Sequence, residues 1–324
     1  MSTKNTENLT ARKNAWIITP AFNEAENIQQ FLIDLHGSLG SVTDQYKFTL
    51  AVIDDGSRDH TRQKVIESRS LFDEQYFDVR CFSLIRNFGH QAALTCGLIE
   101  AQDHHADVVV TMDADGEHPP SIILKLLELW SQGIPIVHTV RNEATHLPYF
   151  KRVTSQLFYF LMRLGGLNIK PGMADFKAWD GILLKQVASF LPNCGSIRLF
   201  SVWVYSDGPL VSFDQVFREG RKSRFTLKKM ASLATRGFFS YTDLPLRMST
   251  LIGGCTLFFC LFFSIFSLVA FSIGKTLPGW TSVVILISFL SGVQIFSIGL
   301  IGEYLIQKVF RSNLPLFILN RKKR

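Results

Sequence analysis

Several patterns that mark common classes of protein are missing from this chain of 324 residues. No Gly-x-Gly-x-x-Gly motif and no Walker A sequence occurs, which argues against a dinucleotide-binding dehydrogenase and a P-loop protein. The five cysteines have no metal-ligand spacing, so neither a zinc site nor a disulfide framework is expected. With 19% charged and 47% hydrophobic residues, the composition also excludes a disordered chain and a coiled coil.

The charge is unevenly distributed. From Arg221 to the end the chain has 14 basic and 2 acidic residues, whereas residues 1–220 have 20 basic and 25 acidic ones. A nucleic-acid-binding protein would more often carry basic residues across its main fold, so no nucleic-acid partner is expected. The basic residues border long apolar runs, which is typical of a membrane surface.

Two runs of 27 residues each lack any charge, one between Arg247 and Lys275 and one between Lys275 and Glu303. Each is longer than the roughly 20 residues that cross a bilayer. We therefore expect transmembrane helices at 247–274 and 280–302, joined by a short turn in which Trp280 suits the interface. The alternative is a pair of buried helices in a soluble domain, although core helices are seldom so long and so uniformly apolar.

The positive-inside rule predicts the orientation of this hairpin. Basic residues flank both outer ends, whereas the turn contains only Lys275. The chain is therefore expected to be a multi-pass protein of the inner membrane, with both termini and residues 15–224 in the cytoplasm. Residues 1–14 are predicted to be a polar tail without the apolar core of a signal peptide, and 303–324 a basic cytoplasmic tail.

The first two-thirds of the chain alternates between strand and helix patterns. We expect strands at 16–19, 48–53, 79–84, 107–112 and 134–140, and helices at 23–37, 59–70, 91–101 and from Pro119 to about Trp130. Pro20 is expected to end the first strand. This alternation predicts an α/β fold with a mostly parallel sheet covered by helices on both faces. In such folds the ligand lies at the carboxyl ends of the strands, where the polar clusters of this chain fall.

The sequence Met112-Asp113-Ala114-Asp115 follows the fourth expected strand. Asp113 and Asp115 could both face one ion, and Glu117 could add a third ligand. Carboxylate oxygens suit Mg²⁺ or Mn²⁺, which bridge to substrate phosphates. An ordinary acidic turn is the alternative, since Asp-x-Asp is common by chance.

The sequence Asp54-Asp55-Gly56-Ser57 follows the second expected strand. The two carboxylates could accept hydrogen bonds from a base N–H or from ribose hydroxyls, and Gly56 would permit a close backbone approach. The alternative is a turn and helix N-cap supplied by Ser57 or Asp59.

Six ordered motifs together give a specific resemblance, spanning about residues 15–305: PAFNEAENI, VIDDGSRDHT, RNFGHQAALTCGL, MDADGEHPP, GMADF and REGRKSRFTLKKM. With the two apolar runs, they resemble the family-2 glycosyltransferases that load a sugar onto a polyprenyl phosphate. The resemblance implies a GT-A catalytic domain over 15–224, a nucleotide-sugar donor, a divalent metal, and a polyprenyl phosphate acceptor in the bilayer. The resemblance is compatible with either a monomer or a homo-oligomer.

The same resemblance implies roles for individual residues. Pro20, Phe22, Asn23, Glu24, Asp54, Asp55, Gly56 and Asp113 would bind the nucleotide sugar. Asp113 and Asp115 would be catalytic through the metal, which Glu117 would help to hold. Asp175 would be catalytic by facing the sugar or the acceptor, with a helix cap as the alternative. Arg218, Ser223 and Arg224 would hold the acceptor phosphate, whereas the roles of Arg221 and Lys222 stay open because this stretch has one extra residue.

The segment 225–246 is predicted to be an amphipathic helix at the membrane interface. Leu227, Met230, Leu233 and Phe238 share one face, with basic residues off that face. The alternative is a connector packed on the head. Two alternative functions are a processive polysaccharide synthase, which would need a Gln-x-x-Arg-Trp signature that this sequence lacks, and a non-catalytic membrane scaffold.

Overall fold

The computed structural model describes residues 12–142, residues 156–214 except 157, 161 and 165, and isolated helical residues between 262 and 305. The chain divides into two compact units. The first unit comprises Met1–Ser155, Asn168–Arg224 and Pro315–Arg324, and the second comprises Gln156–Leu167 and Phe225–Leu314. The functional residues described below lie in the first unit.

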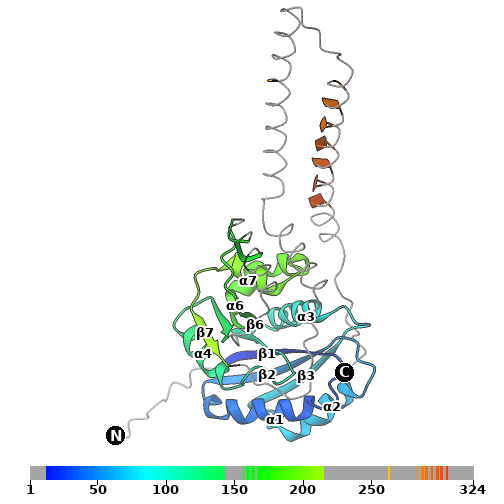
Figure 1. The fold of residues 1–324 in the computed structure, drawn as a ribbon. Helices are drawn as coiled ribbons and strands as arrows, with labels where there is room; N and C mark the ends of the chain where they lie inside the picture. Colours follow the sequence, from blue (N-terminus) through cyan, green and yellow to red (C-terminus); the bar gives the residue numbers. More distant parts are fainter. Residues whose placement is uncertain are drawn as a thin grey trace, which may run out of the picture. The chain divides into compact units, whose positions relative to one another are not determined.

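One sheet runs through the described part of the first unit (Figure 1). Its strands are β1 (Lys13–Ala21), β2 (Tyr46–Asp54), β3 (Phe77–Ser83), β4 (Val108–Thr111), β5 (Ile136–Arg141), β6 (Met173–Asp180) and β7 (Leu210–Phe213). They are arranged in the order β3-β2-β1-β4-β6-β5-β7. Strand β6 is antiparallel to both of its neighbours, and the other paired strands are parallel. The expected mostly parallel α/β sheet is therefore present, with one reversed strand inside it.

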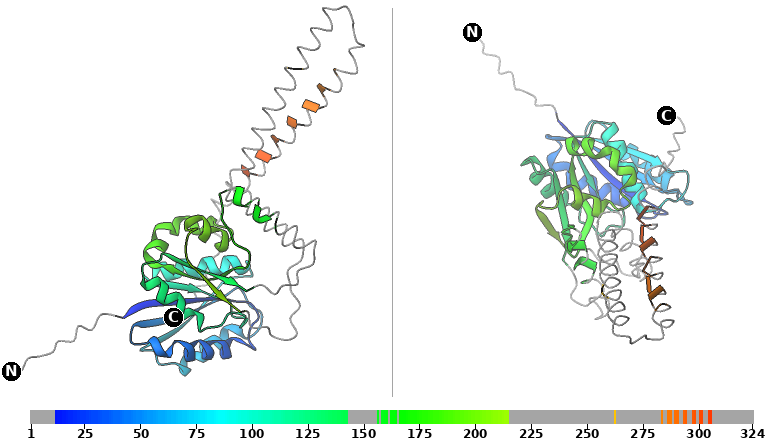
Figure 2. Two further views of the ribbon diagram at one scale, coloured as in Figure 1. Left: turned by 60° about the vertical axis from the view of Figure 1, so that its left-hand side comes forward. Right: turned by 90° about the horizontal axis from the view of Figure 1, so that it is seen from above.

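Helices cover both faces of this sheet (Figure 2). The described α-helices of the first unit are α1 (Ile28–Leu39), α2 (Thr61–Ser68), α3 (His90–Asp103), α4 (Ile122–Ser131), α6 (Gly181–Val187) and α7 (Ile197–Val204). Three short 3₁₀ turns accompany them at Gly40–Val42, Arg69–Leu71 and Ala188–Asn193. Helices α1 and α4 pack their apolar faces on one side of the sheet, and α3, α6 and α7 lie on the other side.

The central strands are buried on both faces, which explains their nearly continuous apolar sequences. Ala15, Ile18, Val52 and Val109 are fully buried. Close packing of α3 against the sheet requires a glycine at position 97, because a Cβ atom there would lie 2.3 Å from the Ile18 side chain. The sheet is thus closely packed on both faces, and the loops that contain the polar clusters leave it at the carboxyl ends of its strands.

The five expected strands are all present, but β1 does not end at Pro20. It continues to Ala21, where it pairs with Asp54 of β2. Pairing of β1 with β4 stops at Ile18, whose carbonyl oxygen accepts a hydrogen bond from the Met112 N–H. The nitrogen of Pro20 lies on that same side of the strand, beyond the last pair, so its missing N–H costs no ladder hydrogen bond.

The first helix also begins later than predicted, at Ile28 and not at Asn23. Asn23 has a φ of 55°, which a right-handed helix cannot accommodate. Helix α4 begins at Ile122, after Pro119 and Pro120, whose carbonyl oxygens accept hydrogen bonds from Ile122 and Ile123. The loops preceding α1 and α4 are therefore longer than the sequence suggested, and both border the site.

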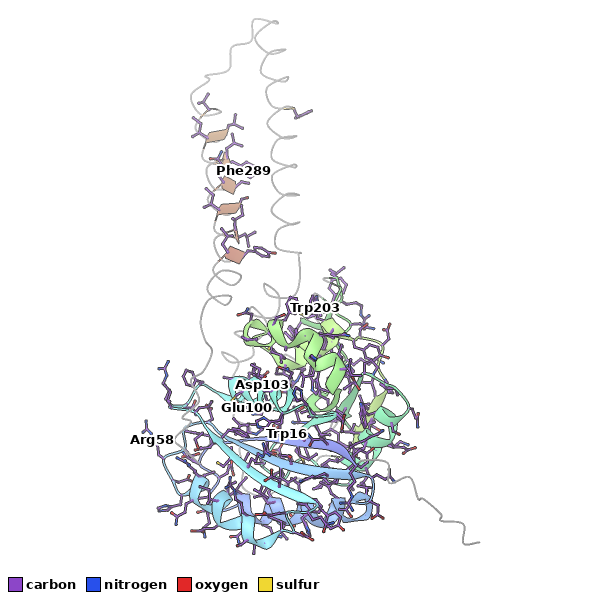
Figure 3. All side chains as sticks on the ribbon, turned by 180° about the vertical axis from the view of Figure 1, so that it is seen from behind. Trp16, Arg58, Glu100, Asp103, Trp203 and Phe289 are labelled. Atoms are coloured by element: carbon purple, nitrogen blue, oxygen red, sulfur yellow. The ribbon has the colours of Figure 1, made fainter. Side chains whose placement is uncertain are left out.

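Residues 1–11 and the amphipathic segment 225–246 lie outside the described residues, as do most of the expected transmembrane hairpin and of the tail at 303–324. Strand β1 begins at Lys13, so the expected polar tail 1–14 ends about two residues early. Within the part of the chain that the structure describes, no helix is long and apolar enough to cross a membrane. The scattered residues of the second apolar run that are described are helical (orange in Figure 1), and Phe289 among them is labelled in Figure 3.

Candidate active site

The loops after β1 and β2 are joined by hydrogen bonds at the carboxyl edge of the sheet. The Asn23 N–H donates to Ser57 Oγ at 2.9 Å, and the Arg58 N–H donates to Asn23 Oδ1 at 2.9 Å. The Glu24 N–H donates to Thr61 Oγ1, and the Ala25 N–H donates to Asp59 Oδ2. Asn23 and Glu24, two of the expected nucleotide-binding residues, thus hold the loop after β1 against the loop after β2. The neighbouring residue Phe22 is 40% exposed.

Asp54 and Asp55, at the end of β2, are both buried. One oxygen of Asp54 accepts a hydrogen bond from the Ser57 N–H at 2.9 Å. The two oxygens of Asp55 accept hydrogen bonds from the N–H groups of Phe88 and Gly89, at 2.8 and 2.9 Å. Burial raises the pKa of Asp55, and these two backbone hydrogen bonds partly offset the increase. Asp55 therefore anchors the turn that leads into α3, in addition to any contact with a ligand.

Gly56 approaches the protein's own backbone. Its φ is 70°, and a Cβ atom at this position would lie 2.5 Å from the carbonyl carbon of Arg86. The sequence had suggested a close approach to a ligand. The structure adds a packing role, in which the missing side chain lets the loop after β2 lie directly on residues 86 and 87.

Asp113 follows β4 and is held by a buried histidine. The Asp113 N–H donates a hydrogen bond to Nδ1 of His118 at 3.1 Å. The His118 ring stacks on Phe176 and contacts Phe213 edge-on. Burial lowers the pKa of His118 to about 3, so the ring is neutral and Nδ1 is an acceptor. The 3.9 Å contact between this nitrogen and the Asp113 carboxylate is therefore not an ion pair.

The Asp113 carboxylate is held in a position that disfavours its charge. Burial raises its pKa to about 6, and the charges of Asp175 and Asp115 add to this effect, against the opposing influence of His90 and Arg141. Its Oδ1 is buried and accepts no hydrogen bond from any described residue, and Nε2 of His90 lies 3.4 Å away. A buried carboxylate oxygen that accepts no hydrogen bond is suited to binding a cation, because a nearby positive charge favours the ionised form of the carboxyl group.

Asp115 and Glu117 lie in the turn that follows. Asp115 Oδ1 accepts a hydrogen bond from the Glu117 N–H, and a Glu117 oxygen lies 3.8 Å from the Arg141 guanidinium. No group of three or more His, Cys, Asp or Glu side chains in the described part of the chain is arranged to hold a metal ion. Mg²⁺ and related ions are often held by only one or two carboxylates together with substrate phosphates. The hard oxygen of Asp113 fits a cation of that kind, bound together with a substrate.

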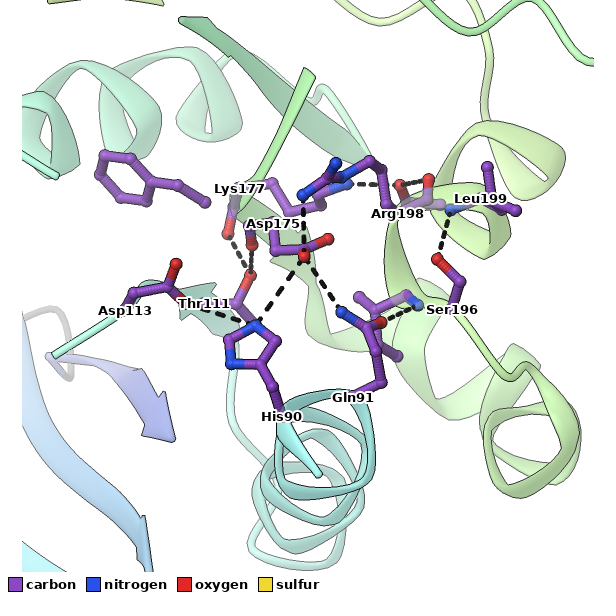
Figure 4. Close-up of polar contacts among 12 residues, drawn as sticks. His90, Gln91, Thr111, Asp113, Asp175, Lys177, Ser196, Arg198 and Leu199 are labelled. Atoms are coloured by element: carbon purple, nitrogen blue, oxygen red, sulfur yellow. Dashed lines mark hydrogen bonds and ion pairs between the residues drawn. The ribbon is translucent and has the colours of Figure 1, made fainter. Parts of the chain in front are cut away.

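Asp175 lies in β6 and is not a helix cap; Asp180 instead caps α6 by accepting hydrogen bonds from Ile182 and Leu183. Figure 4 shows the contacts of Asp175. Its Oδ2 accepts hydrogen bonds from Gln91 Nε2 at 3.0 Å and from an Arg198 nitrogen at 3.1 Å. Burial opposes ionisation, but the electrostatic influence of Arg198, Lys177 and His90 and the hydrogen bond from Arg198 outweigh it and lower the pKa of Asp175 well below its ordinary value.

His90 joins the two acidic sites. Its Nε2 lies 3.4 Å from Asp113 Oδ1 and 3.8 Å from Asp175 Oδ2 (Figure 4). Asp113 and Asp175 are 62 positions apart in the sequence. The fold thus places both of them against one imidazole at the start of α3, which supports the expectation that they serve the same site.

Lys177 lies two residues after Asp175 and is completely buried. Its Nζ donates to Ser201 Oγ at 2.6 Å, and this hydroxyl donates to the Arg198 carbonyl oxygen at 2.8 Å. Burial and the Arg198 charge lower the pKa of Lys177 to about 7, against the opposing charge of Asp175. Lys177 therefore ties β6 to the turn of α7 that carries Arg198.

Five residues of this site are not identified from the sequence: His90, Gln91, His118, Lys177 and Arg198. A signal was available for Asp175 and Lys177, since polar residues at 175 and 177 alternate with Ala174, Phe176 and Ala178, as in a strand. No comparable pattern marks Gln91 or Arg198. The expected acceptor residues Arg218, Ser223 and Arg224, together with Arg221 and Lys222, lie outside the described residues.

Comparison with known proteins agrees with the resemblance. The model of glycosyl transferase family 2 matches residues 16–179. An uncharacterised glycosyltransferase of Bacillus subtilis (strain 168), YkoT, is 30% identical over 89% of this chain and 86% of its own length. The bactoprenol glucosyl transferase of Shigella phage SfII is 27% identical over 95% of this chain and 98% of its own length.

A solved structure of glucosyl-3-phosphoglycerate synthase from Mycobacterium tuberculosis, in complex with Mn²⁺ and UDP-glucose, gives a TM-score of 0.45. It is 20% identical and the match covers 72% of this chain and 79% of that chain. A likeness of this size carries no weight for the function. The sequence matches do: this chain belongs to glycosyl transferase family 2, and it is a glycosyltransferase.

Proposed function

We propose that this glycosyltransferase transfers a hexose from a nucleotide sugar, linked to UDP or GDP, to a polyprenyl phosphate at a membrane surface. The observation that carries the proposal is the pair of carboxylates, the half-buried Asp113 and the buried Asp175, that both contact His90 at the carboxyl edge of the sheet. This is the edge at which α/β folds bind ligands. Relatives named bactoprenol glucosyl transferase match nearly their whole length to this chain, which supports a lipid acceptor.

The second apolar run supports an anchor in the bilayer. Its described residues are helical, and large apolar side chains among them are exposed, including Val283, Ile287, Phe289 and Ile298. Apolar side chains left uncovered along a helix suit a lipid environment. We propose that 247–274 and 280–302 span the inner membrane, with both termini and the catalytic domain in the cytoplasm, and that the basic segment after residue 220 lies at lipid headgroups.

The divalent metal belongs to the same proposal. Asp113 and Asp115 would hold Mg²⁺ or Mn²⁺ with help from Glu117, and the ion, when bound, neutralises charge on the leaving diphosphate. Glu117 is in turn oriented by the Arg141 guanidinium. The raised pKa of Asp113 is consistent with a site that gains from a cation.

The chain's own residues then have mainly to bind and orient the two substrates. An oxygen of the acceptor phosphate attacks the anomeric carbon, and the bond from that carbon to the diphosphate oxygen breaks, with inversion. The acceptor phosphate is already an anion at neutral pH, so no strong general base is needed. Arg218, Ser223 and Arg224 would align this phosphate and reduce its repulsion with the donor.

The experiment that tests the proposal uses membranes containing the full chain, undecaprenyl phosphate and a panel of radiolabelled nucleotide sugars with Mn²⁺. Transfer of label into the organic phase by the wild type, its loss in EDTA, and its loss in Asp113→Ala and Asp115→Ala are expected. Asp44→Ala, an exposed position outside the site, is the matched control and should keep full activity. Label transfer that persists in EDTA would exclude the metal role, and no transfer from any donor would exclude the function.

The acceptor residues need a separate readout. Arg218→Ala and Arg224→Ala each remove a charge-assisted hydrogen bond to phosphate, so the efficiency of transfer to lipid should fall roughly 10–100-fold. Affinity for the free nucleotide diphosphate with Mn²⁺, measured by calorimetry, should change little. A parallel loss of both would assign these arginines to the donor diphosphate.

A further inference from the structure

His90, the first residue of α3, faces an oxygen of Asp113 that is buried and has no hydrogen-bond donor among the described residues. The His90 Nε2 atom lies 3.4 Å from Asp113 Oδ1 (Figure 4). An imidazolium that pairs with a carboxylate usually approaches to about 2.7–2.9 Å and donates a hydrogen bond. The His90 contact is longer than that, so it leaves Oδ1 unsatisfied. A buried acceptor in this state is costly unless a ligand occupies it.

The separation of these two atoms is the one expected for two ligands of the same ion. Divalent ions such as Mg²⁺ and Zn²⁺ bind oxygen or imidazole nitrogen at about 2.0–2.2 Å. Two neighbouring ligands of an octahedral ion, about 90–100° apart, are then roughly 2.8–3.4 Å from each other. The observed 3.4 Å lies at the upper end of this range. One ion can therefore be bound by His90 and Asp113 with little movement of either side chain.

His90 also contacts Asp175, at 3.8 Å, but that carboxylate is less suited to the ion. Its Oδ2 accepts a hydrogen bond from Arg198 at 3.1 Å, and the guanidinium would repel a second cation. The Asp175 side chain is only 8% exposed, whereas 24% of Asp113 and 42% of His90 are open to solvent. The pair that an ion can reach is therefore His90 and Asp113.

A second described histidine, His118, contacts Asp113 but is not available to an ion. Its Nδ1 already accepts the hydrogen bond from the Asp113 N–H, and its side chain is completely buried. The imidazole of His90 makes no such backbone contact through Nε2, the nitrogen that faces Asp113. The two histidines thus have different roles: His118 holds the turn after β4, and His90 presents a nitrogen to the Asp113 carboxylate.

We propose that Nε2 of His90 is a direct ligand of the divalent ion at Asp113, and that this nitrogen makes the site favour Mn²⁺ or Co²⁺ over Mg²⁺. The inference rests on the proposed function and deepens it, because it adds a residue of α3 to the expected carboxylate ligands and selects among the ions. Imidazole is a good ligand for the later transition metals, whereas Mg²⁺ prefers oxygen ligands.

The test measures metal binding directly, with the purified full chain in detergent and Mn²⁺ added below the protein concentration. Pulsed electron paramagnetic resonance should detect a ¹⁴N coupling from a directly bound imidazole in the wild type. This coupling should be lost in His90→Asn. Loss of an outer-shell partner alone typically weakens metal binding by 10–100-fold, so loss of a direct ligand should weaken Mn²⁺ binding at least roughly tenfold.

His105→Asn is the matched control, because His105 is an exposed histidine whose φ of 52° is one that Asn tolerates. It should keep both the ¹⁴N coupling and the Mn²⁺ affinity. His90→Glu replaces the nitrogen by an oxygen ligand at the same position. Its ¹⁴N coupling should also be lost, but Mg²⁺ should now compete with Mn²⁺ several-fold better than in the wild type. A purely structural role for His90 would not produce this change in preference.

Two results would overturn the inference: bound Mn²⁺ without a ¹⁴N coupling in the wild type, or a coupling that persists in His90→Asn. Should His90→Asn fail to fold, as judged by circular dichroism, His90→Glu decides, since it also removes the ring nitrogen. A wild type that transfers no hexose but shows the coupling that depends on His90 would exclude the proposed reaction and keep the ligand. Transfer that is lost in EDTA, with no nitrogen coupling, would keep the reaction and exclude the ligand.

Discussion

The backbone N–H of Asp113 donates a hydrogen bond to Nδ1 of His118, five residues further along the chain, at 3.1 Å. This bond closes the turn after β4 and fixes the direction in which the Asp113 carboxylate leaves the strand. Because the His118 ring is stacked on Phe176, this turn is also packed against strand β6 of the sheet. The geometry of the candidate metal site therefore depends on a neutral, buried histidine.

His118 makes the protein sensitive to acid. Its pKa is lowered from 6.5 to about 3, so the unfolded chain binds a proton between these values that the folded protein excludes. Stability from this group is present above pH 6.5 and falls by about 1.4 kcal/mol for each pH unit below it. In His118→Phe this slope should disappear, while at pH 7.5 the variant should be less stable by about 1–3 kcal/mol, because Asp113 loses its acceptor.

Urea unfolding of the solubilised protein at pH 7.5, 6 and 5, followed by tryptophan fluorescence, measures both effects. The quantity to compare is the difference between variant and wild type, since other groups titrate equally in the two. A constant difference across this range would contradict a neutral buried His118.

Asp113 has the opposite pH dependence. Its pKa is raised from 3.8 to about 6, so its stabilising protonated form is lost as the pH rises through 6. The difference corresponds to roughly 3 kcal/mol at pH 7.5. Without metal, Asp113→Asn should therefore raise the melting temperature by roughly 5–10 °C at pH 7.5 and by little at pH 4, while transfer activity is lost.

Thermal unfolding in EDTA at the two pH values tests this prediction, with Asp44→Asn as the exposed control. Added Mn²⁺ should narrow the gap at pH 7.5, because the ion stabilises only the wild type. If Asp113→Asn is less stable than the wild type at pH 7.5, then burial does not destabilise the ionised Asp113 carboxylate, and the prediction is wrong.

Gly56 should matter for folding more than for ligand binding. Alanine at this position combines a φ of 70° with a Cβ atom 2.5 Å from the Arg86 backbone. Gly133→Ala is a matched control, since Gly133 has a φ of 90° but no atom within 4 Å of its Cβ position. The control should lose about 1–2 kcal/mol of unfolding free energy, the cost of the left-handed conformation. Gly56→Ala should lose clearly more than its control in the same denaturation experiment.

Equal losses in the two variants would show that residues 86 and 87 can move away. A Gly56→Ala variant of normal stability that no longer binds nucleotide would restore the interpretation drawn from the sequence, in which the glycine faces a ligand.

The sequence predicts the part of the fold that rests on continuous apolar runs. Strands β1, β2, β4 and β5 contain such runs, whereas β3 includes Asp78 and Arg80, and the polar clusters after β2 and β4 do lie at the carboxyl edge. Strand β6 was missed because Asp175 and Lys177 are buried in it as charged groups, which sequence patterns treat as solvent-exposed. Its antiparallel insertion between β4 and β5 is a long-range pairing that no local pattern encodes.

The same limit applies to the site. Asp113, Asp115 and Glu117 stand out because they follow a strand together, whereas Gln91 and Arg198 acquire meaning only when α3 and α7 meet at Asp175. The partners of Asp55 could not be predicted for a related reason. Phe88 and Gly89 donate to it through their backbone N–H groups, which nearly every residue has and which no side-chain pattern therefore marks.

The topology of the two apolar runs yields the last prediction. A reporter active only in the cytoplasm, fused after Arg324, should be active, and the same reporter inserted at Gly279 should be inactive, because the basic residues before Arg247 and after Glu303 favour the cytoplasmic side. A reporter active only outside the cytoplasm should give the reverse pattern. Changing Lys275 to Glu should leave both signals unaltered, since acidic residues contribute little to orientation. Cytoplasmic activity at Gly279 would mean that the runs do not form a spanning hairpin, and the lipid acceptor would then have to reach the catalytic domain in another way.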